Sequence, residues 1–289
     1  MKTAFVLSGG ASLGAVQVGM LQALIEQGIT PDVLVGTSAG ALNTAYISGH
    51  GATPSSVQSL AQVWAHLNVR TLFAVDPVHV LRALAGKSSS VCSDRGLRTQ
   101  LRRHLTFETL EDAPIPLVVV TTELATGGEV SLRTGDALNA ILASCAIPGV
   151  FPPVMWEGKA LVDGGLADNT AVSQAVLAGA ETVYVLPSGF ACALPEPPRT
   201  AMGAVTHALA ILTHQRLITE VAQYSSEVDL IVLPPPCPLA VSPINFGHSQ
   251  DLIQLGYASA TEMLARDGGR RPHPEHAIAM HTHDSGPHG

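Results

Sequence analysis

The sequence predicts an α/β fold with a mainly parallel central sheet. Two short apolar runs, residues 3–7 and 33–35, have the composition of strands that are buried on both faces. A segment with helical periodicity follows each run, at about residues 15–28 and 38–48. Strands that alternate with helices over such a short stretch are typical of a βαβ unit, which requires parallel strands.

The alternation of strands and helices continues along the chain. Further strands are expected at residues 117–122, 129–132, 182–186 and 230–233, with a short one ending at Val162. Further helices are expected to begin at Thr53-Pro54 and to cover about residues 94–105, 136–145, 200–225 and 249–266. Because no repeat and no long linker interrupts this pattern, we expect one domain over residues 1–267.

Composition excludes several classes of protein. The chain has 289 residues, of which 46% are hydrophobic and 13% charged, so it can bury a large core and is not disordered, collagen-like or a coiled coil. Its net charge of −8 argues against nucleic acid as a partner. The uncharged stretch between Lys2 and Glu26 resembles a signal peptide, but its glycines suit a buried strand and helix better, so we expect a cytoplasmic protein.

The composition changes after residue 267. Gly, Pro and His dominate residues 268–289, which contain five of the twelve histidines: His273, His276, His281, His283 and His288. This segment lacks the apolar residues that would fix the geometry of a metal site. We therefore expect a disordered tail, and neither a metal nor a cofactor.

A nucleophile motif follows the second predicted strand. Residues Gly36-Thr37-Ser38-Ala39-Gly40 fit the pattern G-x-S-x-G, in which a sharp turn between a strand and a helix exposes a serine oxygen. Small residues at Gly36 and Gly40 relieve crowding at that turn. Alone the motif also fits an inert turn, so Ser38 is a candidate that needs further support.

A glycine-rich segment follows the first predicted strand. Residues 8–14 lack the second glycine of a dinucleotide-binding fingerprint and the Gly-Lys-Ser/Thr of a P-loop. What remains is a group of backbone N–H donors at the start of a helix, which favours developing negative charge. Beside an activated serine, such a loop would serve as an oxyanion hole.

A third motif supplies a carboxylate. Asp163 ends a short predicted strand, and Gly164 and Gly165 allow a tight turn after it. By itself, Asp-Gly-Gly is also an ordinary turn sequence.

Together the three motifs resemble the patatin-like phospholipase family, which carries Gly-Gly-Gly-x-Arg/Lys-Gly, Gly-x-Ser-x-Gly and Asp-Gly-Gly/Ala in this order. Residues 143–153 also look like the stretch that precedes the aspartate of that family, and the resemblance runs from Phe5 to about Val185. It implies a three-layer α/β/α sandwich and a lipid acyl hydrolase of the phospholipase A or carboxylesterase type.

The resemblance assigns roles residue by residue. It makes Ser38 the nucleophile and Asp163 the catalytic aspartate, and it places the oxyanion hole at Gly9, Gly10 and Ala11, with supporting glycines at positions 14, 36, 40, 164 and 165 (Gly14, Gly36, Gly40, Gly164 and Gly165). The chain departs from the family at two positions. Ala11 replaces a glycine, and Leu13 replaces the basic residue, which weakens the case for strict phospholipid specificity.

The implied mechanism has two competitors. In a serine–aspartate dyad, Asp163 accepts the proton of Ser38, an acyl-enzyme forms, and water releases the acyl group. A Ser-His-Asp esterase would instead need a histidine such as His207, His214 or His248. A non-catalytic lipid-binding or regulatory protein could use the same scaffold.

The expected partner is a lipid or another acyl ester, with peripheral membrane contact as a further option. Residues 147–154 are apolar and fit either a lipid contact or a buried connection beside the site. Arg95, Arg98, Arg102 and Arg103 fit either a surface for anionic head groups or a solvated helix face. Acyl length, head group and oligomeric state are not encoded in these motifs.

Overall fold

The computed structural model describes residues 1–73, 80–81, 85–189, 197–237 and 241–281. In this part of the chain one sheet has the strand order β5-β6-β3-β2-β1-β7-β8, and β4 pairs with β3. The strands are β1 (Thr3–Leu7), β2 (Val33–Thr37), β3 (Leu117–Glu123), β4 (Glu129–Leu132), β5 (Val154–Trp156), β6 (Lys159–Asp163), β7 (Thr182–Leu186) and β8 (Asp229–Val232).

Five adjacent strands, β3-β2-β1-β7-β8, are parallel, whereas β4, β5 and β6 are antiparallel to their neighbours. The expected mainly parallel sheet is therefore confirmed. Leu7 pairs with Gly36 and Thr37 pairs with Val120, so β1, β2 and β3 reach the same end of the sheet. The loops that follow β1 and β2 consequently start side by side.

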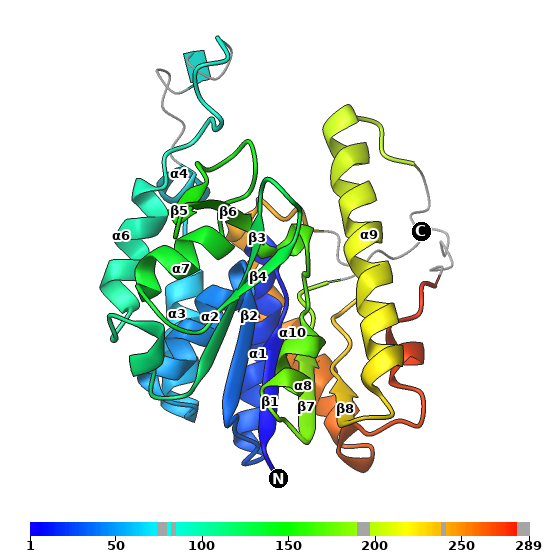
Figure 1. Cartoon of the computed structure of the whole chain (residues 1–289). Coiled ribbons are helices and arrows are strands. Elements are labelled where there is room, and N and C mark those ends of the chain that lie inside the picture. Colours follow the sequence, from blue (N-terminus) through cyan, green and yellow to red (C-terminus); the bar gives the residue numbers. More distant parts are fainter. Residues whose placement is uncertain (74–79, 82–84, 190–196, 238–240, 282–289) are drawn as a thin grey trace.

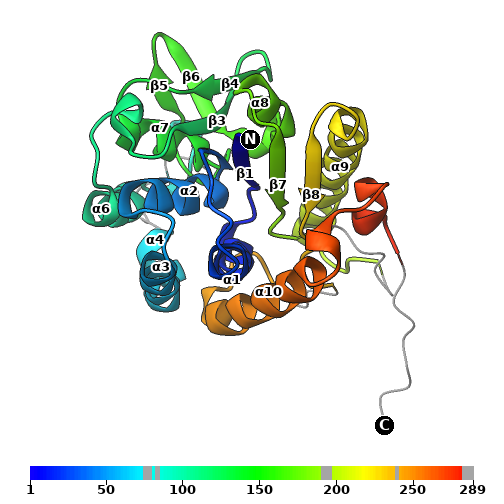
Figure 2. The ribbon, with the colours of Figure 1, turned by 90° about the horizontal axis from the view of Figure 1, so that it is seen from below.

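Helices cover both faces of the sheet, as Figures 1 and 2 show. They are α1 (Gly14–Glu26), α2 (Ala39–His50), α3 (Pro54–His66), α4 (Val69–Leu72), α6 (Arg95–His104), α7 (Ala137–Ser144), α8 (Val172–Leu177), α9 (Ala201–Tyr224) and α10 (Ser249–Leu264). None of the helices that the structure describes is both long enough and apolar enough to cross a membrane.

Alternation along the strands separates two hydrophobic clusters. Phe5 and Leu34 belong to the cluster that includes residues of α1, α2, α3, α7 and α10, whereas Val6 and Val35 belong to the cluster beneath α8 and α9. Consecutive side chains of a strand point to opposite faces, so each central strand needs apolar residues at every position. This arrangement is the expected three-layer α/β/α sandwich.

The uncharged N-terminal stretch is part of the core. It forms β1 and α1, and most side chains of α1 are buried because α10 and α3 pack against this helix. Gly19 allows the close approach of α10, since a Cβ atom there would lie 2.0 Å from the carbonyl oxygen of Ile253.

The expectation of a disordered tail is wrong for its first part. Pro274–Ile278 form a 3₁₀ helix, and Pro274 and Ile278 are buried. Ile278 is fully enclosed in the cluster beneath α9. A few buried side chains, Ile278 among them, contribute to docking the segment, and a count of Gly, Pro and His does not reveal them. Residues 282–289, with His283 and His288, lie outside the described residues.

Candidate active site

Ser38 occupies a strained turn between β2 and α2. Its backbone angles, φ 52° and ψ −119°, are rare for a residue with a side chain. The flanking glycines make the turn possible, because a Cβ atom would lie 2.3 Å from Thr44 Oγ1 at Gly36 and 2.1 Å from the Leu7 carbonyl oxygen at Gly40. The G-x-S-x-G motif therefore forms the expected sharp turn.

Two neighbouring side chains hold the backbone of this turn. The Ser38 N–H donates to Ser144 Oγ at 2.8 Å, and the same hydroxyl donates to the Val120 carbonyl oxygen at 2.6 Å. The Cys145 thiol donates to the Ser38 carbonyl oxygen at 3.3 Å. Ser144 and Cys145 end α7, so this helix ties the turn to β3.

The strand registers explain how Ser38 and Asp163 meet. On β3, Val120 pairs with Thr37 of β2 and the next residue, Thr121, pairs with Asp163 of β6. Because β4 occupies the opposite edge of β3, β2 and β6 share one edge and meet end to end. Asp163 therefore arrives next to the residue that follows β2.

The two side chains are hydrogen-bonded. Ser38 Oγ donates to Asp163 Oδ2 at 2.7 Å, and the Gly165 N–H donates to Asp163 Oδ1 at 2.8 Å. Burial raises the pKa of Asp163 to about 6, although both hydrogen bonds oppose this rise. Gly164 lies against the Val120 carbonyl oxygen, where a Cβ atom would be 2.3 Å away. The turn after Asp163 thus needs the first of its two glycines.

The glycine loop (residues 9–14) lies beside Ser38. A Cβ atom at Gly9 would be 3.1 Å from Ser38 Cβ, and one at Gly14 would be 2.8 Å from Ala39 Cβ. At Gly10 a Cβ atom would overlap the hydroxyl of Ser188. Ala11 has φ 50°, a left-handed conformation that favours glycine, so the replacement of the family's glycine by alanine carries backbone strain here.

The amides of the loop differ in their availability. The Gly9 N–H donates to the Asn169 carbonyl oxygen at 3.2 Å. Among the described residues none accepts a hydrogen bond from the amides of Gly10 or Ala11. The amide of Gly9 is therefore engaged, whereas those of Gly10 and Ala11 have no acceptor in the described part of the chain. Leu13 packs against the core. Its side chain is uncharged, so this position adds no positive charge to the loop.

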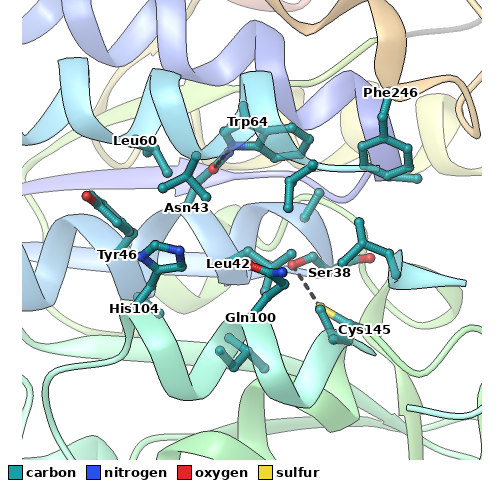
Figure 3. Close-up of a pocket in the computed structure, with 18 of the residues that line it drawn as sticks. Ser38, Leu42, Asn43, Tyr46, Leu60, Trp64, Gln100, His104, Cys145 and Phe246 are labelled. Atoms are coloured by element: carbon teal, nitrogen blue, oxygen red, sulfur yellow. Dashed lines mark hydrogen bonds between the residues drawn. The ribbon is translucent and has the colours of Figure 1, made fainter. Parts of the chain in front are cut away.

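An apolar cavity of about 110 Å³ opens beside Ser38. The described residues that line it include no Lys, Arg, Asp or Glu; they are Ala11, Ser38, Ala39, Leu42, Asn43, Ala45, Tyr46, Leu60, Val63, Trp64, Leu67, Leu72, Phe73, Leu97, Gln100, Leu101, His104, Leu105, Cys145, Ile147, Phe151 and Phe246. In Figure 3, Ser38 and Cys145 lie toward one end of this cavity, and Tyr46 and His104 toward the other.

The cavity follows α2. Leu42 and Tyr46 lie one and two turns beyond Ser38 on this helix, and both line the cavity. Eight residues of helix correspond to ~12 Å, so the part of the lining that α2 contributes is about as long as a medium acyl chain. Trp64 closes one side, and its Nε1–H donates to Asn43 Oδ1 at 2.8 Å, which satisfies both polar groups.

The histidines expected for a rival triad lie elsewhere. His248 is exposed at the start of α10, with its Nδ1 3.5 Å from Asp251 Oδ2, and His214 is buried in α9. Among the described residues, Asp163 is the acceptor for Ser38 Oγ. No group of three or more His, Cys, Asp or Glu able to hold a metal ion occurs in the described residues.

The segment at residues 147–154 connects buried structure. Phe151 is buried, and both Ile147 and Phe151 line the cavity, so this segment faces the site.

Helix α6 packs through its leucines: Leu97 and Leu101 are buried. Arg98 is partly buried and donates hydrogen bonds to Asp94 and Asn139. The other three arginines of α6 are exposed to solvent: Arg95, Arg102 and Arg103.

Several residues that position the site carry no motif. Ser188 Oγ donates to the Gly9 carbonyl oxygen at 2.6 Å, and Gln17 Nε2 donates to the Ser8 carbonyl oxygen at 2.8 Å. Asn169 Nδ2 reaches the same Gly9 oxygen at 3.4 Å. The sequence offers one signal for them, namely polar residues inside otherwise apolar runs, which in a buried setting need partners.

The sequence of this chain is similar to those of known proteins. A family model described as "Patatin-like phospholipase" matches residues 5–176. Lysophospholipase NTE1 of Pyricularia oryzae is 25% identical over 92% of this chain and 19% of its own length. Patatin-like phospholipase domain-containing protein 7 of Rattus norvegicus is 30% identical over 64% of this chain and 13% of its own length.

The chain thus spans less than a fifth of either relative. Among solved structures, VipD from Legionella pneumophila is 16% identical with a TM-score of 0.48, covering 91% of this chain and 66% of VipD. The family match, which covers more than half of the chain, shows that this protein belongs to the patatin-like phospholipase family.

Proposed function

We propose that this protein hydrolyses the ester bond of a lipid that carries a single acyl chain, with Ser38 as the nucleophile. The observation that carries the proposal is the 2.7 Å hydrogen bond from Ser38 Oγ to Asp163 Oδ2 at one end of an apolar cavity. The family match and the names of the lysophospholipase relatives support the class of substrate.

The mechanism follows from the hydrogen bond. Asp163 accepts the proton of Ser38 as Ser38 Oγ attacks the ester carbonyl carbon, and the alcohol leaves with a proton returned by Asp163. Asp163 then takes a proton from water, which attacks the acyl-enzyme. As the fatty acid is released, Asp163 returns that proton to Ser38 Oγ, and the enzyme is ready for another cycle. The raised pKa of Asp163, about 6, makes this carboxylate a stronger base than an exposed aspartate.

The glycine loop supplies the electrostatic part of the mechanism. The amides of Gly10 and Ala11 stabilise the oxyanion of the tetrahedral intermediate, because no described residue competes for them. Loss of one such donor typically lowers turnover by about 10²–10³. Ser188 and Asn169 act as positioning residues, since they fix the carbonyl of Gly9.

The lining of the cavity favours hydrophobic recognition of the acyl chain. The described lining residues include no Lys or Arg that could bind a phosphate, and Leu13 stands where the family has a basic residue. We therefore expect the acyl chain, rather than the head group, to dominate substrate selection.

Hydrolysis of a panel of nitrophenyl esters and lysophospholipids tests the proposal. We expect the wild-type protein to cleave medium-chain esters and Ser38→Ala to lose at least about 10³-fold in kcat/KM. Ser173→Ala, on α8 and away from the cavity, is the matched control and should keep wild-type rates. Equal hydrolysis by wild type and Ser38→Ala would exclude Ser38 as the nucleophile, and no hydrolysis by the wild type would favour a non-catalytic lipid-binding protein.

For location, we propose a cytoplasmic protein that meets its lipid substrate at a membrane surface. The apolar run of residues 3–25 forms β1 and α1 and is part of the buried core. Cys237, however, is disulfide-bonded, a state more common in oxidising compartments. Cell fractionation distinguishes a cytoplasmic from a secreted location, and recovery in the secreted fraction would contradict the proposal.

A further inference from the structure

Helix α9 has two halves with different surroundings. In its C-terminal half, Leu217 and Val221 are buried against the sheet, and Arg216 forms ion pairs with Asp168 at 3.0 Å and Glu220 at 3.1 Å. This half is therefore anchored to the loop that follows Asp163. The N-terminal half extends beyond the sheet at the top of Figure 1.

The extending half presents apolar side chains to solvent. Val205, Leu209 and Leu212 are 57%, 46% and 66% exposed. Their spacing of four and three residues places them on one face of the helix, which we call the apolar face of α9. From residue 200 to residue 215 the sequence has no Asp, Glu, Lys or Arg. An apolar stripe of this width normally faces a protein core, and here it faces outward.

Two other exposed apolar side chains lie close to the candidate active site at the same end of the sheet. Leu166 follows Asp163 by three residues and is 52% exposed. Ile244 is 65% exposed and follows Pro243, whose carbonyl oxygen accepts the N–H of Ser12 in the glycine loop. The apolar face of α9, Leu166 and Ile244 therefore all lie at the end of the sheet where Ser38 lies.

We propose that the apolar face of α9 inserts into the surface of a zwitterionic phospholipid assembly and brings Ser38 to its substrate. The choice of a lipid occupant rests on the proposed function, and the composition of the face supports it independently. Protein interfaces are enriched in Trp, Tyr and Arg at their energetic centres, whereas this face offers Val, Leu and Ala. A fluid surface needs no matching shape or hydrogen bonds.

The charge of the protein favours a zwitterionic lipid surface over an anionic one. The chain has a net charge of −8, and the N-terminal half of α9 has no Lys or Arg that could attract an anionic surface. Binding must therefore come from burial of apolar side chains, as an uncharged or zwitterionic surface allows.

Partition of the full chain onto phosphatidylcholine vesicles, measured by co-sedimentation in the Ser38→Ala background, tests the proposal. We expect Leu209→Glu and Leu212→Glu each to weaken partition by about tenfold or more, because each removes a leucine that the lipid would bury and puts a charge in its place. The matched control is Leu177→Glu. Leu177 is 73% exposed at the end of α8, near the opposite end of the sheet, so this variant should bind like its parent.

The same α9 variants with an intact Ser38 should hydrolyse a monomeric short-chain ester at the wild-type rate. Unchanged vesicle partition in both α9 variants overturns the proposal, and so does an equal loss in Leu177→Glu. A dimer in sedimentation that Leu209→Glu converts to a monomer also overturns it, since a second copy would then cover the face. Vesicle binding without any ester hydrolysis would refute the proposed function alone.

Discussion

Asp163 combines burial with two hydrogen bonds, and these influences act in opposite directions on its pKa. Burial wins, so the pKa lies near 6. Because the proposed mechanism needs the ionised carboxylate, kcat/KM should be low at pH 5, rise through an apparent pKa of about 6 and level off above pH 7. A pH–rate profile with a monomeric ester measures this directly, and a profile that is flat from pH 4 to pH 8 would exclude Asp163 as the base.

Ala11 is a second position where a single residue can be tested. Its φ of 50° costs an alanine roughly 1–2 kcal/mol, which glycine does not pay. We therefore expect Ala11→Gly to leave the free energy of unfolding unchanged or to raise it by about 1 kcal/mol, with activity retained.

The control for this substitution is Ala258→Gly on the exposed side of α10, which should lose about 1 kcal/mol. Urea denaturation of both variants gives the comparison. Equal losses at the two positions would show that the backbone at Ala11 is not strained.

At the scale of elements, α2 provides both the turn at Ser38 and one wall of the cavity. Leu42 lies one turn beyond Ser38 on this wall. Leu42→Trp should block the cavity close to the nucleophile, so kcat/KM for decanoyl esters should fall by at least about tenfold while that for acetyl esters stays within about threefold.

Leu255→Trp, on the exposed face of α10, controls for the added bulk and should change neither rate. If Leu42→Trp lowered both rates equally, or neither, the acyl chain would not occupy this cavity.

Most elements could be predicted because their signals are local. The apolar runs of β1, β2, β3 and β7 and the periodicity of the long helices set their positions within a few residues. Strand β5 was not predicted, since residues 147–154 contain three prolines and read as irregular. The docking of Ile278 beneath α9 was also missed, because it depends on a contact with a distant part of the chain.

The candidate site likewise has features that local motifs predict and features that depend on contacts between distant segments. Ser38 and Asp163 could be singled out because each lies in a motif, and strand register accounts for their meeting. Motifs could not show that the Gly9 amide is already bonded to Asn169 or that Ser144 holds the Ser38 N–H. Both facts depend on pairings between segments more than 100 residues apart in the chain.

For the whole molecule, two buried carboxyl groups make stability depend on pH. Burial and the neighbouring Asp168 raise the pKa of Glu220 to about 8, and burial raises that of Asp163 to about 6. A raised pKa means that the folded state binds a proton more tightly than the unfolded state. The free energy of unfolding contributed by these groups is therefore present below pH 4 and is lost as pH rises through 6 and 8.

Thermal unfolding at pH 5 and pH 8 measures this dependence. Glu220→Gln keeps an oxygen to accept the Val172 N–H but cannot ionise, so the drop in Tm between the two pH values should shrink by a few degrees. Glu262→Gln, an exposed residue of α10, should leave the drop unchanged. A drop that is identical in wild type and Glu220→Gln would show that Glu220 does not titrate in this range.

The account as a whole depends on a covalent acyl-Ser38 intermediate. Intact-mass spectrometry after brief mixing with a medium-chain nitrophenyl ester, followed by peptide mapping, detects it directly. We predict that one acyl group is added to the peptide containing Ser38 in wild type and that none is added in Ser38→Ala. Turnover without any acylated Ser38, or acylation that persists in Ser38→Ala, would contradict the account.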